Sequence, residues 1–198
     1  PERYPAQSVV VIDSQGDLIR NIASRKIFAP GQPLADRLVL IDPTDILHPP
    51  ALNMFDVGQD EFANMKPGDR AALYNGTVEL YGYLFSELLD ANLTARQATL
   101  FRFLAQLLLV IPESNLLVFL AILEDDEEYL SYAAQLDTTA QTFFETQYVG
   151  DEFKGPKKEI AWRLWGLISN SALASMFNSP KSKIDLDAEL QRGAVVLI

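Results

Sequence analysis

The stretch "VVVIDSQGDLIRNI", residues 9–22, decides how the rest of the chain is interpreted. An apolar run ends at Asp13, and a glycine turn leads into a segment in which Leu18, Ile19 and Ile22 recur at roughly helical spacing. Continuous β-branched runs are typical of strands that are buried on both faces of a parallel sheet. In doubly wound sheets ligands bind at the carboxyl ends of the strands, so we expect Asp13 to approach a site.

A second apolar run of the same kind, "RLVLI" at 37–41, follows after a proline- and glycine-rich break and ends at Asp42. The two runs bracket one helical segment, so the sequence predicts a βαβ unit in which strands 8–12 and 37–41 are parallel. "AVVLI" at 194–198 returns to the strand pattern, and we expect it in the same sheet. Either carboxylate could also do no more than cap the turn that follows it.

Between these runs the apolar period becomes helical. The chain therefore predicts an α/β segment at 1–70, an all-α inserted domain at 71–180 and a return to the α/β segment at 181–198. Thr94 followed by Gln97 has the pattern of a capping box. The predicted helices cover 71–90, 94–110, 115–123, 126–136, 138–148 and 157–177.

The net charge of -11 is unevenly distributed. Residues 51–150 hold 4 Lys or Arg against 15 Asp or Glu, whereas the segments on either side are nearly balanced. Phosphate binding needs clustered Lys or Arg, so the middle of the chain is a poor surface for DNA. The acidity fits either a solvated helical exterior, which we favour, or a docking face for a basic partner.

The composition indicates a packed globular protein, with 48% apolar and 22% charged residues in a chain of 198. No apolar run is long enough to suggest a transmembrane helix, and the absence of Cys fits a cytosolic chain. A chain that starts without Met and stops within an apolar run at Ile198 is expected to be a fragment.

Two further patterns carry little chemistry. "GDEFKGPKK" at 150–158 lacks the Lys that must follow the second glycine of a phosphate-binding loop, because Pro156 intervenes, and we expect an ordinary loop. His48 is the only histidine, and without cysteines it supports neither a typical zinc site nor a catalytic triad.

The aromatic helix "IAWRLWGLISN" at 160–170 and the acidic run "LEDDEEY" at 123–129 have simple structural explanations. Trp162 and Trp165 fall at helical spacing, for which core packing is a simpler explanation than base stacking. The acidic run is typical of a solvated helix start. Arg163 either forms an internal ion pair, which we favour, or projects toward a neighbouring subunit.

Several segments together resemble the HerA/FtsK superfamily of hexameric DNA-pumping ATPases, and most of all its conjugation or type IV secretion branch. This branch carries a strand similar to "IDPHGDL", then one similar to "FDPTD", an Asn-Pro stretch, and an all-α region before the next core strand. The matching segments here are "IDSQGDL" (12–18), "IDPTD" (41–45), "LNM" (52–54) and "IDLDAELQRGAVVLI" (184–198).

The resemblance implies an α/β fold, a parallel-sheet P-loop NTPase-like core fragment with a large all-α insertion. It implies that the parent protein uses ATP and Mg²⁺, forms a hexameric ring and moves DNA, in the cytoplasm and possibly at a membrane. DNA would be bound mostly by regions outside this chain, and a protein partner could dock on the acidic helical insertion. Five residues would lie near the nucleotide without contacting it directly: Asp13, Gln15, Gly16, Asp42 and Asn53. Arg163 would be a candidate for an arginine that acts across the boundary between subunits.

The resemblance also places the Walker A loop before this segment and the Walker B strand after it. The chain itself is therefore expected to bind neither ATP nor Mg²⁺ tightly and to be inactive alone, and no metal ligands are expected in it. Two alternatives remain open: a non-catalytic acidic helical module that recruits a protein partner, and part of a viral genome-packaging ATPase.

Overall fold

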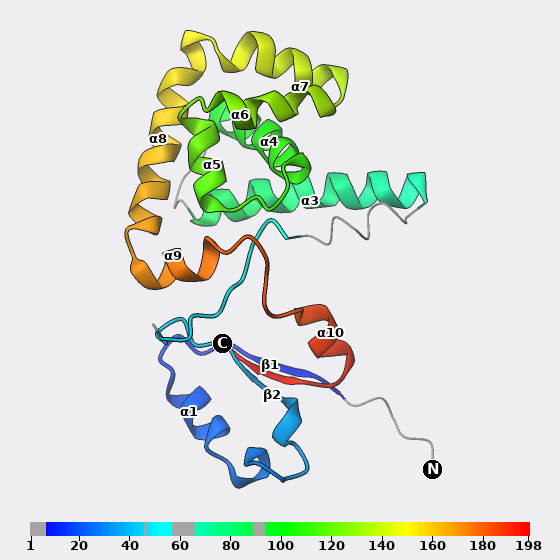
Figure 1. Ribbon diagram of the computed structural model, residues 1–198, viewed down its shortest axis with the longest axis vertical. Helices are drawn as coiled ribbons and strands as arrows, with labels where there is room; N and C mark the ends of the chain where they lie inside the picture. The colour runs from blue at the N-terminus through cyan, green and yellow to red at the C-terminus, as the bar shows by residue number, and fades with distance from the viewer. Residues whose placement is uncertain (1–6, 46, 57–65, 89–93) are drawn as a thin grey trace. The chain divides into compact units, whose positions relative to one another are not determined.

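The structure, a computed structural model, describes residues 7–45, 47–56, 66–88 and 94–198. These residues form two units (Figure 1). The sheet unit consists of the described residues up to Leu52 together with Ser182–Ile198, and the helical unit is Asn53–Lys181.

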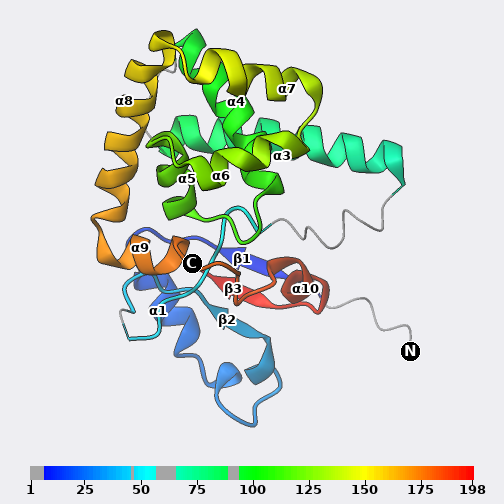
Figure 2. The same ribbon diagram turned by 45° about the horizontal axis from the view of Figure 1, so that its top comes forward.

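Three short strands make up the sheet: β1 (Val9–Val11), β2 (Leu38–Leu40) and β3 (Val195–Leu197). Their order is β1-β3-β2 and both pairings are parallel, as Figure 2 shows. Val195 is paired with Val9 on one side and with Leu38 on the other. The prediction of one sheet with parallel strands at these three places is confirmed, and β3 separates the two strands that are neighbours in sequence.

The expected burial on both faces is found only in the central strand, where the successive residues Val196 and Leu197 are buried, and is wrong for β1 and β2. Val9, Val10 and Leu40 are each about half exposed. The buried residues of the sheet unit include Leu197 of β3 and a small cluster of Ile41, Ala194 and Val196. Each strand pairs over three residues only. A sheet this small offers too little surface for covering layers on both sides, so its outer strands keep apolar side chains in solvent.

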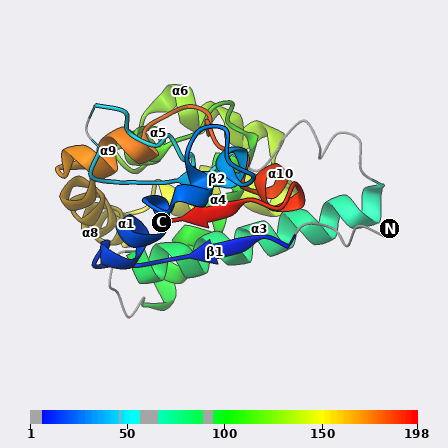
Figure 3. The same ribbon diagram turned by 90° about the horizontal axis from the view of Figure 1, so that it is seen from below.

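Short helical segments connect the strands of the sheet unit. They are α1 (Asp17–Ala23), the 3₁₀ turns η1 (Lys26–Phe28) and η2 (Ala35–Arg37), and α10 (Leu186–Gln191). The guanidinium group of Arg37 donates to the carbonyl oxygens of Gly193 and Gln7, and that of Arg192 donates to the carbonyl oxygen of Asp36. These hydrogen bonds tie the turn before β3 to the starts of both outer strands. Figure 3 shows the ribbon of these elements from below.

Helices form all the regular structure described for the helical unit. They are α3 (Pro67–Leu88), α4 (Ala95–Val110), α5 (Leu116–Leu123), α6 (Glu127–Leu130), the 3₁₀ segment η3 (Ser131–Gln135), α7 (Thr138–Thr142), the π-helix η4 (Phe143–Tyr148), α8 (Asp151–Ile168) and α9 (Ser171–Phe177). Helix α8 packs against both α4 and α5 (Figure 1).

An aromatic and aliphatic core holds these helices together. Phe85 from α3 stacks on Phe101 from α4 with ring centroids 5.3 Å apart, and Phe119 from α5 lies 4.7 Å from Phe85. The capping box predicted for the second helix is present, since the Thr94 side chain and the Gln97 side chain each accept from the other's backbone N–H. Burial of whole aromatic rings is the main stabilising term in such a core.

Helix α8 departs from two predictions. It begins at Asp151, so the stretch 150–158 expected to be a loop is helical from its second residue. Pro156 lies inside the helix and has no N–H to donate to a carbonyl oxygen of the first turn. The helix therefore loses a single hydrogen bond, near its amino-terminal end. The helix predicted at 157–177 is divided into two. Helix α8 ends at Ile168, and the side chain of Asn170 caps the start of α9.

The expected fold class is wrong. The structure is 61% helical and its sheet has three short strands, so the fold is mostly helical and not a P-loop NTPase-like α/β core. The runs at 8–12, 37–41 and 194–198 have the composition of buried strands, but in each only three residues pair, and the outer strands keep apolar side chains half exposed. Within the described residues, every helix is too short or too polar to cross a bilayer.

Candidate functional site

A pocket of about 440 Å³ lies at the carboxyl ends of the three strands. Its walls come from the turn after β1, the start of α1, the turn after β2 and Ile198 beyond β3. Backbone hydrogen bonds close its base: the N–H of Asp13 donates to the carbonyl oxygen of Ile198 at 2.9 Å, and the N–H of Ile41 donates to that of Leu197 at 2.8 Å. The parallel arrangement of the strands therefore brings the two predicted carboxylates, Asp13 and Asp42, to one site.

Asp13 organises the turn into α1. One of its carboxylate oxygens accepts from the N–H of Gln15 at 3.1 Å, and the other accepts from the N–H of Leu18 at 2.9 Å. These hydrogen bonds, that to Gln15 first, and the nearby Arg20 charge hold the pKa of Asp13 below its usual value. The carboxylate is thus ionised at neutral pH, but two of its hydrogen-bonding positions are already used by its own turn.

Asp42 does the same for the turn after β2. The hydroxyl of Thr44 donates to the Asp42 carboxylate at 2.7 Å and the N–H of Thr44 donates to the same oxygen at 2.8 Å. The Thr44 hydroxyl is the main reason why the pKa of Asp42 lies below its usual value, and Arg20 lowers it further. One oxygen of this carboxylate makes both bonds, so the other oxygen is the one available to a ligand.

Arg20 supplies positive charge to the pocket. It donates to Asp17 at 2.6 Å and lowers the pKa of both Asp13 and Asp42. Gly16 allows this arrangement: its φ of 73° belongs to the left-handed region, and a Cβ there would lie 3.3 Å from the Arg20 guanidinium. Any other residue would be strained at this position and would crowd the arginine.

The structure brings four of the six predicted residues together. Asp13, Gln15, Gly16 and Asp42 all line the carboxyl-end pocket. Asn53 belongs to the helical unit, where its buried amide group donates to the carbonyl oxygens of Ser114 at 2.7 Å and Pro180 at 2.8 Å.

The sixth residue, Arg163, lies exposed on α8. The apolar sequence around Arg163 therefore does not bury it. The internal ion pair and the role across a subunit boundary both stay predictions. The single histidine is also exposed: His48 lies 3.5 Å from the Asp45 carboxylate.

The carboxyl-end pocket suits a hard cation better than a phosphate. Two ionised carboxylates favour Mg²⁺ held partly through water. Backbone N–H groups that could cradle a phosphate are already donating to Asp13 and Asp42. Among the residues described, no group of three or more His, Cys, Asp or Glu could hold a metal ion, so a cation here would need further ligands.

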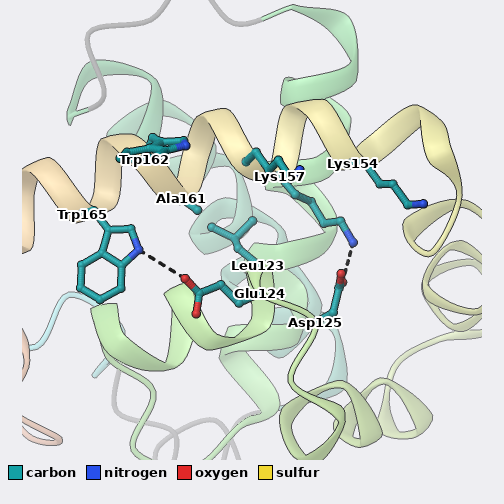
Figure 4. A pocket seen from close by; sticks show the side chains of 9 residues that line it. Leu123, Glu124, Asp125, Lys154, Lys157, Ala161, Trp162 and Trp165 are labelled. Carbon is teal, nitrogen blue, oxygen red and sulfur yellow. Dashed lines mark hydrogen bonds and ion pairs between the residues drawn. The ribbon is translucent and has the colours of Figure 1, made fainter.

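A second pocket, of about 1010 Å³, lies in the helical unit between the end of α5 and one face of α8 (Figure 4). We call it the tryptophan groove. It is lined by Leu123, Glu124, Asp125, Lys154, Lys157, Lys158, Ala161, Trp162 and Trp165.

The sequence analysis missed this groove because it assigned the tryptophans to the core. Trp162 is 76% exposed and Trp165 is 47% exposed, whereas Lys157 of the same helix is buried. A signal was present in the sequence: Lys154, Lys158, Trp162 and Trp165 recur at spacings of four, four and three, which places them along one stripe of a helix.

Comparisons with models of protein families, with curated proteins and with solved structures found no match to this chain. The function therefore has to be argued from the two sites themselves.

Proposed function

We propose that this chain is a segment of an ATP-driven DNA translocase that works as a hexameric ring. One observation carries the proposal: "IDSQGDL" and "IDPTD", the two segments that most resemble the HerA/FtsK superfamily, line a single pocket. That pocket lies at the carboxyl ends of parallel strands, where ligands bind in open sheets of this kind.

In this proposal Asp13 and Asp42 act on a magnesium ion through its bound water. Both pKa values are low, so both side chains carry the negative charge that a hydrated cation needs. The described residues do not fit the phosphates of ATP, since the N–H groups of both turns are already used. Binding of the phosphates and cleavage of ATP are thus assigned to other residues of a longer protein, and this chain alone is expected to show no ATPase activity.

The test uses the longer protein in which this chain lies and measures DNA-stimulated ATPase activity against magnesium concentration. Asp42→Asn removes the charge and keeps an oxygen that can accept both turn hydrogen bonds. Asp13→Asn removes the charge and keeps an acceptor for one of its two turn hydrogen bonds, because Gln15 and Leu18 donate to different oxygens. We expect each to raise the magnesium requirement roughly tenfold or more, the usual cost of losing a residue that orients a metal's ligands.

Asp137→Asn is the matched control, because Asp137 also accepts two backbone N–H groups, those of Thr139 and Ala140, but lies in the helical unit. It should leave the magnesium requirement unchanged. If the Asp13 and Asp42 variants keep both the activity and the magnesium requirement of the unmodified protein, the carboxyl-end pocket has no part in ATP hydrolysis and the proposal fails.

A further inference from the structure

The tryptophan groove presents two large aromatic side chains to solvent. The Trp162 indole forms no hydrogen bond or ring contact with the residues that the structure describes, and Trp165 donates its indole N–H to the Glu124 carboxylate at 3.3 Å (Figure 4). Tryptophan is the residue type most enriched at the centres of protein interfaces, because it buries a large rigid surface at little cost in entropy. Two exposed indoles beside a groove, three residues and so slightly less than one helical turn apart, therefore indicate a binding surface.

One wall of the groove is strongly acidic. Five consecutive acidic residues, 124–128, follow α5, all five are exposed, and the first two line the groove. The ion pair that neutralises one of them joins Asp125 to Lys157, with 2.5 Å between nitrogen and oxygen. The Lys157 ammonium also lies 4.2 Å from the centre of the Tyr148 ring, so this lysine is a buried structural cation and not one presented to a ligand.

Of the other two lysines of the groove, one is already paired with a carboxylate outside it. Lys154 pairs with Asp151 at 2.7 Å. Lys158 is exposed and has no ion pair among the described residues. An anionic ligand such as single-stranded DNA would thus meet one unpaired lysine, the Glu124 carboxylate, and the acidic residues that directly follow it in sequence. Base stacking on the indoles would have to overcome that repulsion.

A cationic ligand finds favourable contacts on both walls. A guanidinium group stacks on the face of an indole, and tryptophan is the best aromatic partner for a cation. The same guanidinium can donate to a carboxylate, in a hydrogen bond that the charges on both groups strengthen. Glu124 is placed for this, since it already reaches the edge of Trp165.

We infer that the tryptophan groove binds an arginine-bearing peptide segment of another protein, with arginine stacked on Trp162 or Trp165 and paired with Glu124. A groove of about 1010 Å³ is too large for a single side chain and suits a segment of several residues. Residues 51–150 carry 15 acidic against 4 basic side chains, and this net negative charge favours approach of a basic partner over long range. This inference does not depend on the proposed ATPase role.

Binding can be followed by intrinsic fluorescence, because the only two tryptophans of the chain both lie in the groove. The probe is an eight-residue peptide in which arginine alternates with glycine, titrated into the whole chain. A peptide with glutamate in place of arginine and a twelve-nucleotide oligothymidine serve as comparison ligands. We expect saturable quenching by the arginine peptide and none by the other two.

Trp162→Ala and Glu124→Gln should each weaken binding of the arginine peptide about tenfold or more, as loss of a central interface residue does. Trp162→Phe should restore part of the affinity, because phenylalanine keeps an aromatic face. Glu145→Gln removes one negative charge from an exposed position of the helical unit outside the groove, and should change the dissociation constant less than twofold. In Trp162→Ala, Trp165 still reports binding, and far-ultraviolet circular dichroism checks that every variant is folded.

Three results would overturn the inference. The first is no saturable binding of the arginine peptide at millimolar concentration. The second is binding that all the variants weaken equally, which would mean diffuse attraction to an acidic surface. The third is tighter binding of the oligothymidine that is lost in Trp162→Ala, which would make the groove a nucleic-acid site instead.

Discussion

Asp125 shows how one residue joins a backbone turn to a buried charge. Its φ is 64°, in the left-handed region that Asp and Asn tolerate better than other residues with a side chain. Its carboxylate accepts from the ammonium group of Lys157, which is buried beneath it. The same aspartate thus ends α5 and makes burial of the lysine possible.

Asp125→Asn should lower the free energy of unfolding by about 1–2 kcal/mol, because the acceptor and the backbone preference remain and only the charge is lost. Asp125→Ala should cost at least 1 kcal/mol more, since it adds backbone strain and leaves Lys157 without a partner. Urea unfolding followed by circular dichroism measures both. Asp126→Asn, at a neighbouring position whose side chain caps α6, is the control and should be close to neutral. Equal effects of the two Asp125 variants would contradict this account of the turn.

Side-chain burial in α8 was the poorest prediction at the scale of residues. Helical spacing correctly indicates which residues share a face, but it does not tell which face meets the core. The usual ranking places tryptophan inside and lysine outside. Here Lys157 is buried because Asp125 and Tyr148 provide it with an ion pair and an aromatic face, and both partners are distant in sequence. No local pattern could supply that information.

At the scale of elements, the sequence predicts a helix start well where a capping side chain is present. The helix predicted from 94 begins after the Thr94 cap, and that predicted from 115 begins after Asn115, which accepts from the N–H groups of Leu117 and Val118. The prediction is less good where helical geometry changes within one segment. The helix predicted at 138–148 is an α-helix followed by the π-helix η4, a difference in hydrogen-bond register that apolar periodicity does not resolve.

The break between α8 and α9 offers an element-scale prediction. Asn170 accepts from the N–H groups of Ala172 at 3.0 Å and Leu173 at 3.2 Å, so it satisfies two donors at the start of α9. Asn170→Ala should lower the free energy of unfolding by about 1 kcal/mol, whereas Asn170→Asp should be nearly neutral, because aspartate caps as well as asparagine. Both are measured by urea unfolding. A rise in helix content without loss of stability in the alanine variant would mean that α8 and α9 had fused into the single helix that the spacing predicts.

At the scale of the whole molecule, buried tyrosines make the helical unit sensitive to alkali. Burial raises the pKa of Tyr74 to about 12 and raises that of Tyr81 and Tyr148 above the ordinary value of 10. The neutral forms are stabilised by folding, so this stability is fully present below pH 10 and is lost as the pH rises through the folded-state values. Tyr81 and Tyr148 also donate to the carbonyl oxygens of Met54 and Ile122, bonds that ionisation would break.

We therefore expect the free energy of unfolding of the helical unit, measured with urea, to fall steadily above pH 10, by about 1.4 kcal/mol per pH unit for each fully buried tyrosine. Tryptophan fluorescence follows this unit alone, since both tryptophans belong to it. Tyr148→Phe should be less stable at neutral pH but show a shallower decline above pH 10. Tyr83→Phe, at an exposed position, should leave the decline unchanged. A decline of the same slope in all three proteins would show that other groups cause it.

The fold class failed at this largest scale although the strand positions were right. Asp13 and Asp42 were correctly expected at the ends of two parallel strands, because an apolar run and its terminal carboxylate are adjacent in sequence. How far the strands pair and what covers their faces depends on contacts between distant residues. The half-exposed Val9, Val10 and Leu40 show that those contacts are few. Local composition therefore located the strands and the carboxyl-end pocket but overestimated the sheet.

The strand order has a consequence for synthesis on the ribosome. β1 and β2 form no pair with each other, and both depend on β3, which is translated about 150 residues after β2. During that interval the two outer strands leave the exit tunnel with open edges and apolar side chains, while the helical unit encoded between β2 and β3 has every residue it needs to fold. Nascent chains paused before β3 should thus hold a folded helical unit and a protease-sensitive amino-terminal segment, which becomes a natural point for chaperones to bind.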